Sequence, residues 1–313
     1  MSKARTGGLF ALLAFIWGST WLVIKIGLAE LPPFLAAGLR FALASGVLAV
    51  LALAREVRFP RGRGEHALLL GVGLSGIGAS YGIVYWAEQY IPSGLTAVLF
   101  ATHPFFTLIL AHLVLNAERI TARKTLGMAI GFLGVLLVFR GDLTFDHPRG
   151  ATAAAVLLLS PLAAATGNVV VKRWGTHLHP FQLSILPMGY GATALLVTSL
   201  AVEGETRIAW SAVAIGSVLY LSILGSVVTF VGYYTLLREV PVTTLNLMSY
   251  VYPMVAVGLG YLVLGEVLDR FALTGAVMVL VGIAIATWRR RRPATAGSGR
   301  ASRGETGVPP GTG

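Results

Sequence analysis

Long apolar segments follow one another along almost the whole chain, and short polar connections separate them. An α-helix needs about 20 residues to cross the roughly 30 Å hydrocarbon core of a bilayer. Several connections contain proline or charge, such as ELPP, YIPS and REVP, which favour the end of one helix and the start of the next. The pattern predicts an all-α polytopic membrane protein. Ten windows have the length and hydropathy of membrane-spanning helices: 7–29, 33–54, 66–87, 92–115, 122–140, 150–171, 179–202, 210–236, 241–264 and 270–288.

The composition agrees with this pattern. Charged residues make up 12% of the chain and hydrophobic residues 56%, with a mean hydropathy of +0.78. A soluble domain carries about 25% charged residues. The chain has no cysteine, which excludes disulfides and thiolate metal sites.

The formal charge of +11 is explained by its distribution over the connections. With both termini in the cytoplasm, 18 of the 24 basic residues fall on the inner side, and only Arg140, Arg149, Arg207 and Arg270 on the outer side. This asymmetry follows the positive-inside rule, so the charge indicates topology and not nucleic-acid binding. We therefore expect a multi-pass protein of the inner or plasma membrane. The inner residues are Lys3, Arg5, Arg55, Arg58, Arg61, Arg63, Arg119, Arg123, Lys124, Lys172, Arg173, Arg238, Arg289, Arg290, Arg291, Arg292, Arg300 and Arg303.

Equivalent residues recur at a nearly constant separation of 147 to 149 positions, which predicts an internal repeat. We expect a first five-helix repeat over 1–145 and a second over 146–292, followed by a disordered cytoplasmic tail over 293–313. Five spans is an odd number, so the second repeat must enter the membrane inverted, an architecture that transporters use for alternating access. The equivalent pairs include Lys25 and Lys172, Tyr85 and Tyr234, Pro92 and Pro241, Pro104 and Pro253, Glu118 and Glu266, and Gly134 and Gly282.

Several segments resemble the EamA-type transporters of the drug/metabolite transporter superfamily. They are WGSTWLVIK in the first span, LRF at 39–41, and HPFFTLILAHLVLNAERITARKTLGMAIGFLGVLLV across the fourth and fifth spans. The second half repeats the last of these as YPMVAVGLGYLVLGEVLDRFALTGAVMVLVGIAIA. The chain departs from the family at Asn116–Ala117–Glu118, where Gly-Glu is commoner. The resemblance implies two five-helix halves and efflux or exchange of small metabolites, amino acids or drugs, often coupled to protons.

Two charges in apolar spans need an explanation. Lys25 lies about 18 residues into the first span, or roughly 27 Å along it at 1.5 Å per residue. It is then a snorkelling or helix-end lysine, or it gates the outer mouth together with Arg40 and attracts an anionic group. In the third span, Glu88 is a candidate proton carrier or partner for Lys25 or Arg40, and an exposed loop acid is the alternative. Tyr81 and Tyr85 precede it, either as an aromatic wall for a substrate or as part of an interfacial belt.

Polar and proline residues in the other spans complete the candidate pathway. His103 is a candidate for proton coupling, because imidazole changes charge near neutral pH, with a buried neutral histidine as the alternative. Pro104 and Pro253 lie mid-span at equivalent positions and are either packing kinks or cavity-lining elements. The remaining candidates are Trp17, Gly18 and Ser19 in the first span, Asn168 in the sixth, Thr229 and Tyr233 in the eighth, and Asn246 and Tyr250 in the ninth. Such polar groups also hold helices together without any other role.

The leading hypothesis is a secondary active transporter, an exporter of small molecules that works by alternating access. An integral-membrane enzyme or a channel for a small polar substrate is the alternative. The spans contain no H-E-x-x-H zinc motif, and the chain has no phosphate-binding loop of the form G-x-x-x-x-G-K-S/T. We expect no cofactor and no metal. The expected partners are a small-molecule substrate and the bilayer, and a homodimer is left open.

Overall fold

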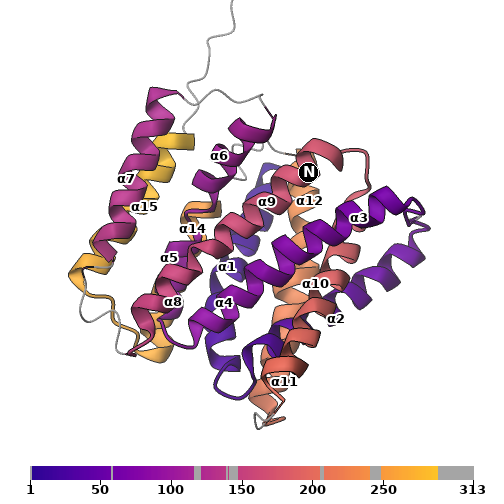
Figure 1. Cartoon of the computed structure of the whole chain (residues 1–313), viewed down its shortest axis with the longest axis horizontal. Helices are drawn as coiled ribbons and strands as arrows, with labels where there is room; N and C mark the ends of the chain where they lie inside the picture. Colours follow the sequence, from indigo (N-terminus) through magenta and orange to yellow (C-terminus); the bar gives the residue numbers. More distant parts are fainter. Residues whose placement is uncertain are drawn as a thin grey trace, which may run out of the picture.

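The computed structural model describes residues 2–57, 59–115, 121–138, 140, 147–204, 208–239 and 248–287, which form helices and short connections (Figure 1). The helices are α1 (Lys3–Gly27), α2 (Pro33–Ala54), α3 (Arg63–Val72), η1 (Gly73–Ala79), α4 (Ser80–Glu88), α5 (Ser93–Phe100), α6 (His103–Leu115), α7 (Ala122–Val138), α8 (Gly150–Leu157), α9 (Leu159–Trp174), α10 (Pro180–Val202), α11 (Ala212–Ser222), η3 (Ile223–Val228), α12 (Thr229–Glu239), α14 (Met248–Leu264) and α15 (Arg270–Thr287).

Each expected span has a helical counterpart, although four of them are divided. The third span consists of α3, η1 and α4, the fourth of α5 and α6, the sixth of α8 and α9, and the eighth of α11, η3 and α12. In the described part of the chain, seven helices are long and apolar enough to cross a membrane. The fifth, ninth and tenth spans correspond to the shorter α7, α14 and α15. The all-α multi-pass membrane architecture is therefore confirmed, while the count of ten spans stays a prediction.

The packing of α7 against α15 relates the two halves of the chain. A Cβ atom added to Gly127 would lie 2.5 Å from the carbonyl oxygen of Gly282, and one added to Gly134 would lie 2.6 Å from that of Gly275. Gly127 is the repeat equivalent of Gly275, and Gly134 is that of Gly282. Each of the two α7 glycines therefore contacts the repeat equivalent of the other α7 glycine. Such an antiparallel, crosswise pairing of equivalent residues is expected of two inverted repeats. Figure 1 shows the two helices side by side at one edge of the bundle.

The two halves are interleaved. Helix α1 packs against α14, and the equivalent pair, α6 and α9, packs in the same way. Helix α2 runs along α10, which joins the second span to the seventh. The centre of the bundle is thus built from helices of both halves, and Ala37, Phe41, Tyr85 and Leu95 are among its fully buried residues.

Two π-helical segments interrupt equivalent spans, and the sequence analysis did not predict either of them. η1 ends at Ala79 and η3 ends at Val228, which are 149 positions apart. A π-turn changes the hydrogen-bond ladder locally and is frequent at functional sites. Helix α10 packs tightly on η1, because a Cβ on Gly191 would lie 2.5 Å from Cβ of Ile77. The equivalent contact, between α2 and η3, involves a charged side chain.

Candidate functional site

Arg40 lies on the inner face of α2. This face also carries Ala36, Ala37, Ala44 and Leu48, which recur at helical spacing and are buried. Glu203 fixes the start of the helix, because its carboxylate accepts hydrogen bonds from the backbone N–H groups of Phe34 at 2.8 Å and Leu35 at 3.0 Å. The side chain of Arg40 is 2% exposed and therefore lies inside the bundle.

Among the described residues, the hydrogen-bond acceptors of the Arg40 guanidinium are all neutral. Its Nε donates to Ser226 Oγ at 3.2 Å, Nη2 to the Gly225 carbonyl at 3.3 Å, and Nη1 to Tyr85 Oη at 3.4 Å. Charge-assisted hydrogen bonds to carboxylates are shorter, about 2.7–2.9 Å. A guanidinium has five N–H groups, so two are left over beside these three bonds. In the described part of the chain, no carboxylate forms an ion pair with it.

The surroundings of this cation are aromatic and come from three segments. The guanidinium carbon lies 4.9 Å from the ring centre of Phe41 and 5.1 Å from that of Tyr81. The carbonyl of Gly225, in π-segment η3, also accepts a hydrogen bond from Thr229 Oγ1 at 2.9 Å. Cation–π contacts stabilise a desolvated guanidinium, but they leave its charge uncompensated. A cation at the centre of a membrane helix costs about 2.5–3.5 kcal/mol, which is why such residues mark functional sites.

Glu88 is an acidic residue close in the sequence to Tyr85, which accepts a hydrogen bond from Arg40. It follows Tyr85 by three residues on α4, so the two side chains lie on one face of the helix. The residue is 0% exposed, and neither carboxyl oxygen has a hydrogen-bond partner among the described residues. The charged groups that act on it electrostatically are Lys25, Glu266 and Arg40. The alternative of an exposed loop acid is therefore wrong, because the carboxyl is buried inside the protein.

Lys25 lies beside Glu88 but bonds to backbone oxygens. Its Nζ donates to the carbonyl of Glu88 and, at 2.9 Å, to that of Ile91. The Glu88 carbonyl belongs to the last residue of α4, where the helix leaves such groups without an internal partner, and the Ile91 carbonyl lies in the connection to α5. Lys25 thus satisfies the end of a neighbouring helix from the end of its own, and this geometry agrees with the helix-end interpretation. A gate at the outer mouth formed by Lys25 together with Arg40 stays a prediction.

A cavity of about 460 Å³ opens beside Lys25, at the end of the bundle where α1 ends and α11 begins. Glu30 and Glu266 also line it. Glu266 holds the start of α5, because its carboxylate accepts from Ser93 N and Oγ, both at 2.8 Å, and from Gly94 N at 3.2 Å. A carboxylate at a helix N-terminus is a stabilising arrangement. One basic and two acidic residues therefore line the cavity together with apolar ones.

His103 forms a separate polar contact between α6 and α9. Its Nε2 lies 3.1 Å from Nδ2 of Asn168 and 3.5 Å from Oγ1 of Thr107. The fourth span breaks between Phe100 and His103, and Pro104 occupies the first turn of α6. Two predicted candidates, His103 and Asn168, are thus brought together, but on helices other than those that hold Arg40 and Glu88.

The candidates of the first span have defined neighbours. Trp17 packs against Tyr233 with ring centres 5.6 Å apart, and Ser19 Oγ lies 2.6 Å from Tyr220 Oη. Gly18 is a close-packing residue, because a Cβ there would lie 2.5 Å from Cβ of Val255 in α14. This contact allows α1 to approach α14.

The ninth span is described only in part. Asn246 lies outside the described residues, and the side chain of Tyr250 does too. Pro253 is buried inside α14, whereas its equivalent Pro104 begins a helix. The predicted symmetry of the two prolines therefore does not extend to identical helix breaks.

Sequence reasoning gave little weight to Ser226 and none to Gly225, Tyr220 or Phe41 as neighbours of the site. Phe41 directly follows Arg40 in the LRF segment, so its position was available as a signal. The Arg40 side chain bonds to Gly225 and Ser226 because the π-segment η3 faces α2. No sequence pattern predicts a π-turn.

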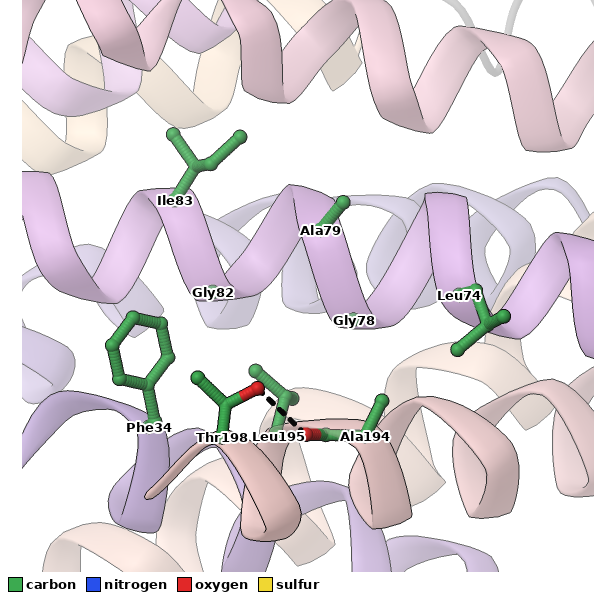
Figure 2. A pocket seen from close by; sticks show the side chains of 9 residues that line it. All are labelled: Phe34, Leu74, Gly78, Ala79, Gly82, Ile83, Ala194, Leu195 and Thr198. Carbon is green, nitrogen blue, oxygen red and sulfur yellow. Dashed lines mark hydrogen bonds between the residues drawn. The ribbon is translucent and has the colours of Figure 1, made fainter. Parts of the chain in front are cut away.

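A second, apolar groove lies on the other side of α4. It has a volume of about 280 Å³ between η1, α4 and α10, with Phe34 at one end. Figure 2 shows Gly78 and Gly82 on the side of their helix that faces Leu195 and Thr198. The Thr198 hydroxyl donates to the Ala194 carbonyl at 2.9 Å. The groove has no charged lining residue, so it is a weaker candidate for a polar ligand than the centre around Arg40.

Comparison with known proteins assigns the chain to a family. The model of the EamA-like transporter family matches it twice, at residues 5–140 and 151–288. An Escherichia coli protein named uncharacterized inner membrane transporter YedA is 32% identical over 285 residues, which are 90% of each chain. A Salmonella typhimurium protein named probable amino-acid metabolite efflux pump is 29% identical over 292 residues, 90% of this chain and 95% of that protein.

A third relative, the Bacillus subtilis protein named uncharacterized transporter YoaV, is 27% identical over 283 residues, 88% of this chain and 94% of that protein. A solved crystal structure superposes with a TM-score of 0.63 at 16% identity and covers 91% of this chain and 97% of its own. At that identity the structure supports the fold alone. The two family matches and the relatives along most of their length lead to one conclusion: this chain belongs to the EamA-like transporter family.

Proposed function

We propose that the protein is a secondary active exporter of small metabolites, amino acids or drug-like compounds, and that it works by alternating access. The inverted packing of α7 on α15 supports this mechanism, because two inverted halves can exchange conformations to open a central site to either side. The relatives named as amino-acid metabolite efflux pumps support the export direction and the class of solute.

The single observation that carries the mechanism is the buried carboxyl of Glu88. An ionised carboxylate without hydrogen bonds is costly in a medium of low dielectric constant, and protonation removes that cost. In one conformation, binding of a proton lowers the free energy of this buried carboxyl. In the next conformation, the carboxyl can exchange the proton for another positive charge. Glu88 is therefore our first candidate for proton coupling. His103 is the second, through its contact with Asn168.

The direction of the protein in the membrane is part of the proposal. The basic connections favour both termini in the cytoplasm of a cell whose inner or plasma membrane holds the protein. The cavity beside Lys25 then lies on the outer side, and the centre around Arg40 lies deeper in the membrane. A substrate would leave from Arg40 past Glu88 and Lys25.

A transporter fits the residues better than an integral-membrane enzyme does. Within the described part of the chain, no group of three or more His, Asp or Glu side chains is arranged to hold a metal ion. The names of the relatives also refer to transport.

The test is transport by the purified full-length protein in liposomes without ATP. We expect a pH gradient to drive accumulation of at least one solute from a broad metabolite panel. Glu88→Gln, His103→Ala and the control Gln89→Ala, at the exposed neighbouring position, are compared in the same assay. Loss of pH-driven transport in Glu88→Gln or His103→Ala, with Gln89→Ala unchanged, is the expected result. No flux of any solute by folded wild-type protein would overturn the transport proposal, and unchanged pH-driven flux in both variants would overturn proton coupling at these residues.

A further inference from the structure

The short connection between α4 and α5 is held in place from two sides. On one side, Lys25 of α1 donates from Nζ to the carbonyl oxygen of Glu88 and, at 2.9 Å, to that of Ile91. On the other side, Glu266 accepts from Ser93 N and Oγ, both at 2.8 Å. The Ile91 side chain is 1% exposed, so the connection packs into this end of the bundle.

Lys25 lies between the outer cavity and a buried acid. It lines the cavity of about 460 Å³ and bonds to the backbone of Glu88. The carboxyl of Glu88 is 0% exposed and has no hydrogen-bond partner in the described part of the chain. Among the charges that act on this carboxyl, Lys25 has the largest effect, ahead of Glu266 and Arg40. A lysine ammonium group has three N–H donors on a flexible stem, so it can turn from one acceptor to another while its helix stays in place.

The charge of Glu88 decides which acceptor Lys25 favours. A neutral carboxyl needs no counter-charge, and the backbone carbonyls that Lys25 bonds in this structure are then good acceptors. An ionised carboxylate inside a protein is costly unless a cation pairs with it, and charge-assisted hydrogen bonds are the stronger ones. Loss of the proton from Glu88 therefore draws Lys25 away from the connection and towards the carboxylate.

We propose that Lys25 is the internal counter-charge of Glu88 and a latch on the outer mouth, which holds the α4–α5 connection while Glu88 is protonated and releases it when Glu88 is ionised. This inference rests on the proposed proton coupling at Glu88 and names the positive charge that replaces the proton. In an export cycle, proton uptake from the outer side closes the outer mouth after the solute has left. Proton release to the inner side frees the connection for the next opening.

Other charged and titratable groups near Glu88 belong to several elements. The helices packed against α4 are α1, α2, α5, α8, α9 and η1, and of these η1 and α5 have no acidic or basic residue. The basic residues of α9 lie in its last turn. His147 stacks on Tyr90, inside the connection, with ring centres 4.9 Å apart, so its titration is a second possible source of pH dependence. The remaining groups are Lys25 and Glu30 from the end of α1, Arg40 from α2, Arg149 before α8, Glu266 after α14, and Tyr81 and Tyr85 on the same helix.

The test measures the accessibility of position 91, and the absence of cysteine from the chain makes a single introduced thiol specific. Solubilised full-length Ile91→Cys is reacted with the anionic reagent sulfonatoethyl methanethiosulfonate from acidic to alkaline pH. Gln89→Cys, at an exposed position of the same connection, corrects for the ionisation of the thiol itself. We expect the reaction rate of Ile91→Cys relative to Gln89→Cys to rise at least about tenfold with pH, because two hydrogen bonds from a charged donor are lost.

Variants in the Ile91→Cys protein distinguish a latch from a contact with a structural role alone. Glu88→Gln keeps this side chain neutral, so the relative rate should stay at its low, acidic value at every pH. Lys25→Met removes the ammonium group, so the relative rate should be high at every pH. The matched control is Lys172→Met, at the exposed repeat equivalent in the last turn of α9, which should leave the pH dependence unchanged. His147→Gln should leave it unchanged as well.

The outcomes decide between the latch and its alternatives. A relative rate that does not change with pH would overturn the latch, as would a pH dependence that persists in Glu88→Gln or Lys25→Met. Loss of the dependence in His147→Gln would assign it to that imidazole and overturn the latch too. Should Ile91→Cys fail to fold, Ala87→Cys takes its place, because Ala87 is 0% exposed and directly precedes Glu88.

The labelling experiment needs no solute, so its result is separate from that of the transport assay. Wild-type protein that transports a solute, with labelling that does not respond to pH, overturns the latch and keeps the proposed function. Folded wild-type protein that transports nothing overturns the proposed function, and the labelling still decides whether Lys25 and Glu88 control the connection.

Discussion

Substitution of Gly134 by alanine tests the close contact between the two halves. A Cβ atom there would lie 2.6 Å from the Gly275 carbonyl oxygen, 2.8 Å from Met278 Cβ and 2.9 Å from Val279 N. All three distances are too short for a methyl group, and none of the atoms belongs to the end of a flexible side chain. Helices α7 and α15 would have to move apart over their whole contact.

The expected cost follows from two opposing contributions. Overpacking of a tight contact destabilises a protein by about 1–3 kcal/mol. Alanine in place of glycine returns roughly 1 kcal/mol through helix propensity. The net loss is about 1–2 kcal/mol in the free energy of unfolding, since the overpacking contribution exceeds the propensity gain.

The assay is thermal unfolding of the solubilised protein, followed by intrinsic tryptophan fluorescence. Gly134→Ala should lower the apparent melting temperature by a few degrees. The control is Gly46→Ala in the middle of α2, where an added Cβ meets nothing within 4 Å and the temperature should stay or rise. Gly275→Ala, with a Cβ 2.5 Å from the Gly134 carbonyl, should resemble Gly134→Ala, and the double variant should cost less than the sum of both. A Gly134→Ala protein as stable as Gly46→Ala would refute the antiparallel glycine contact.

Two further substitutions test the polar contacts around the site. Glu266→Ala removes the acceptor of three hydrogen bonds at the start of α5 and should destabilise the protein by about 1–2 kcal/mol, measured by the same thermal unfolding. The control is Glu65→Ala on α3, where Glu65 caps an exposed turn through Gly62 N at 3.3 Å, and it should cost less. An equal cost of the two substitutions would contradict the capping role of Glu266. Ser226→Ala removes the acceptor of Arg40 Nε and should cost about 1.5–3 kcal/mol, because a buried charged donor loses its partner. Thr235→Ala, at an exposed hydroxyl that bonds only to Val231 O, is the control, and an equal effect of the two would show that Ser226 has no special relation to Arg40.

The sequence predicted the architecture well, because hydropathy and loop charge report directly on the bilayer. Roles that depend on contacts between distant parts of the chain were harder to predict from the sequence. Glu88 stands at the edge of an apolar window, so its depth could not be read from the pattern, and it is buried because α4 ends inside the bundle. The pairing of His103 with Asn168 joins positions separated by 65 residues, and periodicity within one helix says nothing about it.

The π-segments illustrate the same limit. η1 contains the small residues of GLSGIGA, and their pattern does not indicate a π-turn. The change of backbone ladder in η1 depends on how α10 packs on it, through Gly191 against Ile77. In η3 the corresponding change brings Gly225 and Ser226 to Arg40. Arg40 itself was a candidate from its charge alone, and its burial without an ion pair to any described residue followed only from the tertiary structure.

The most direct test of the central claim is proton movement through Glu88. Proteoliposomes with an entrapped pH-sensitive dye receive a transported solute on the outside, and the internal pH is recorded for wild type, Glu88→Gln and Gln89→Ala. Wild type and Gln89→Ala should show internal alkalinisation as protons leave in exchange for the solute, while Glu88→Gln should move the solute without any pH change. An equal pH change in Glu88→Gln would contradict the account.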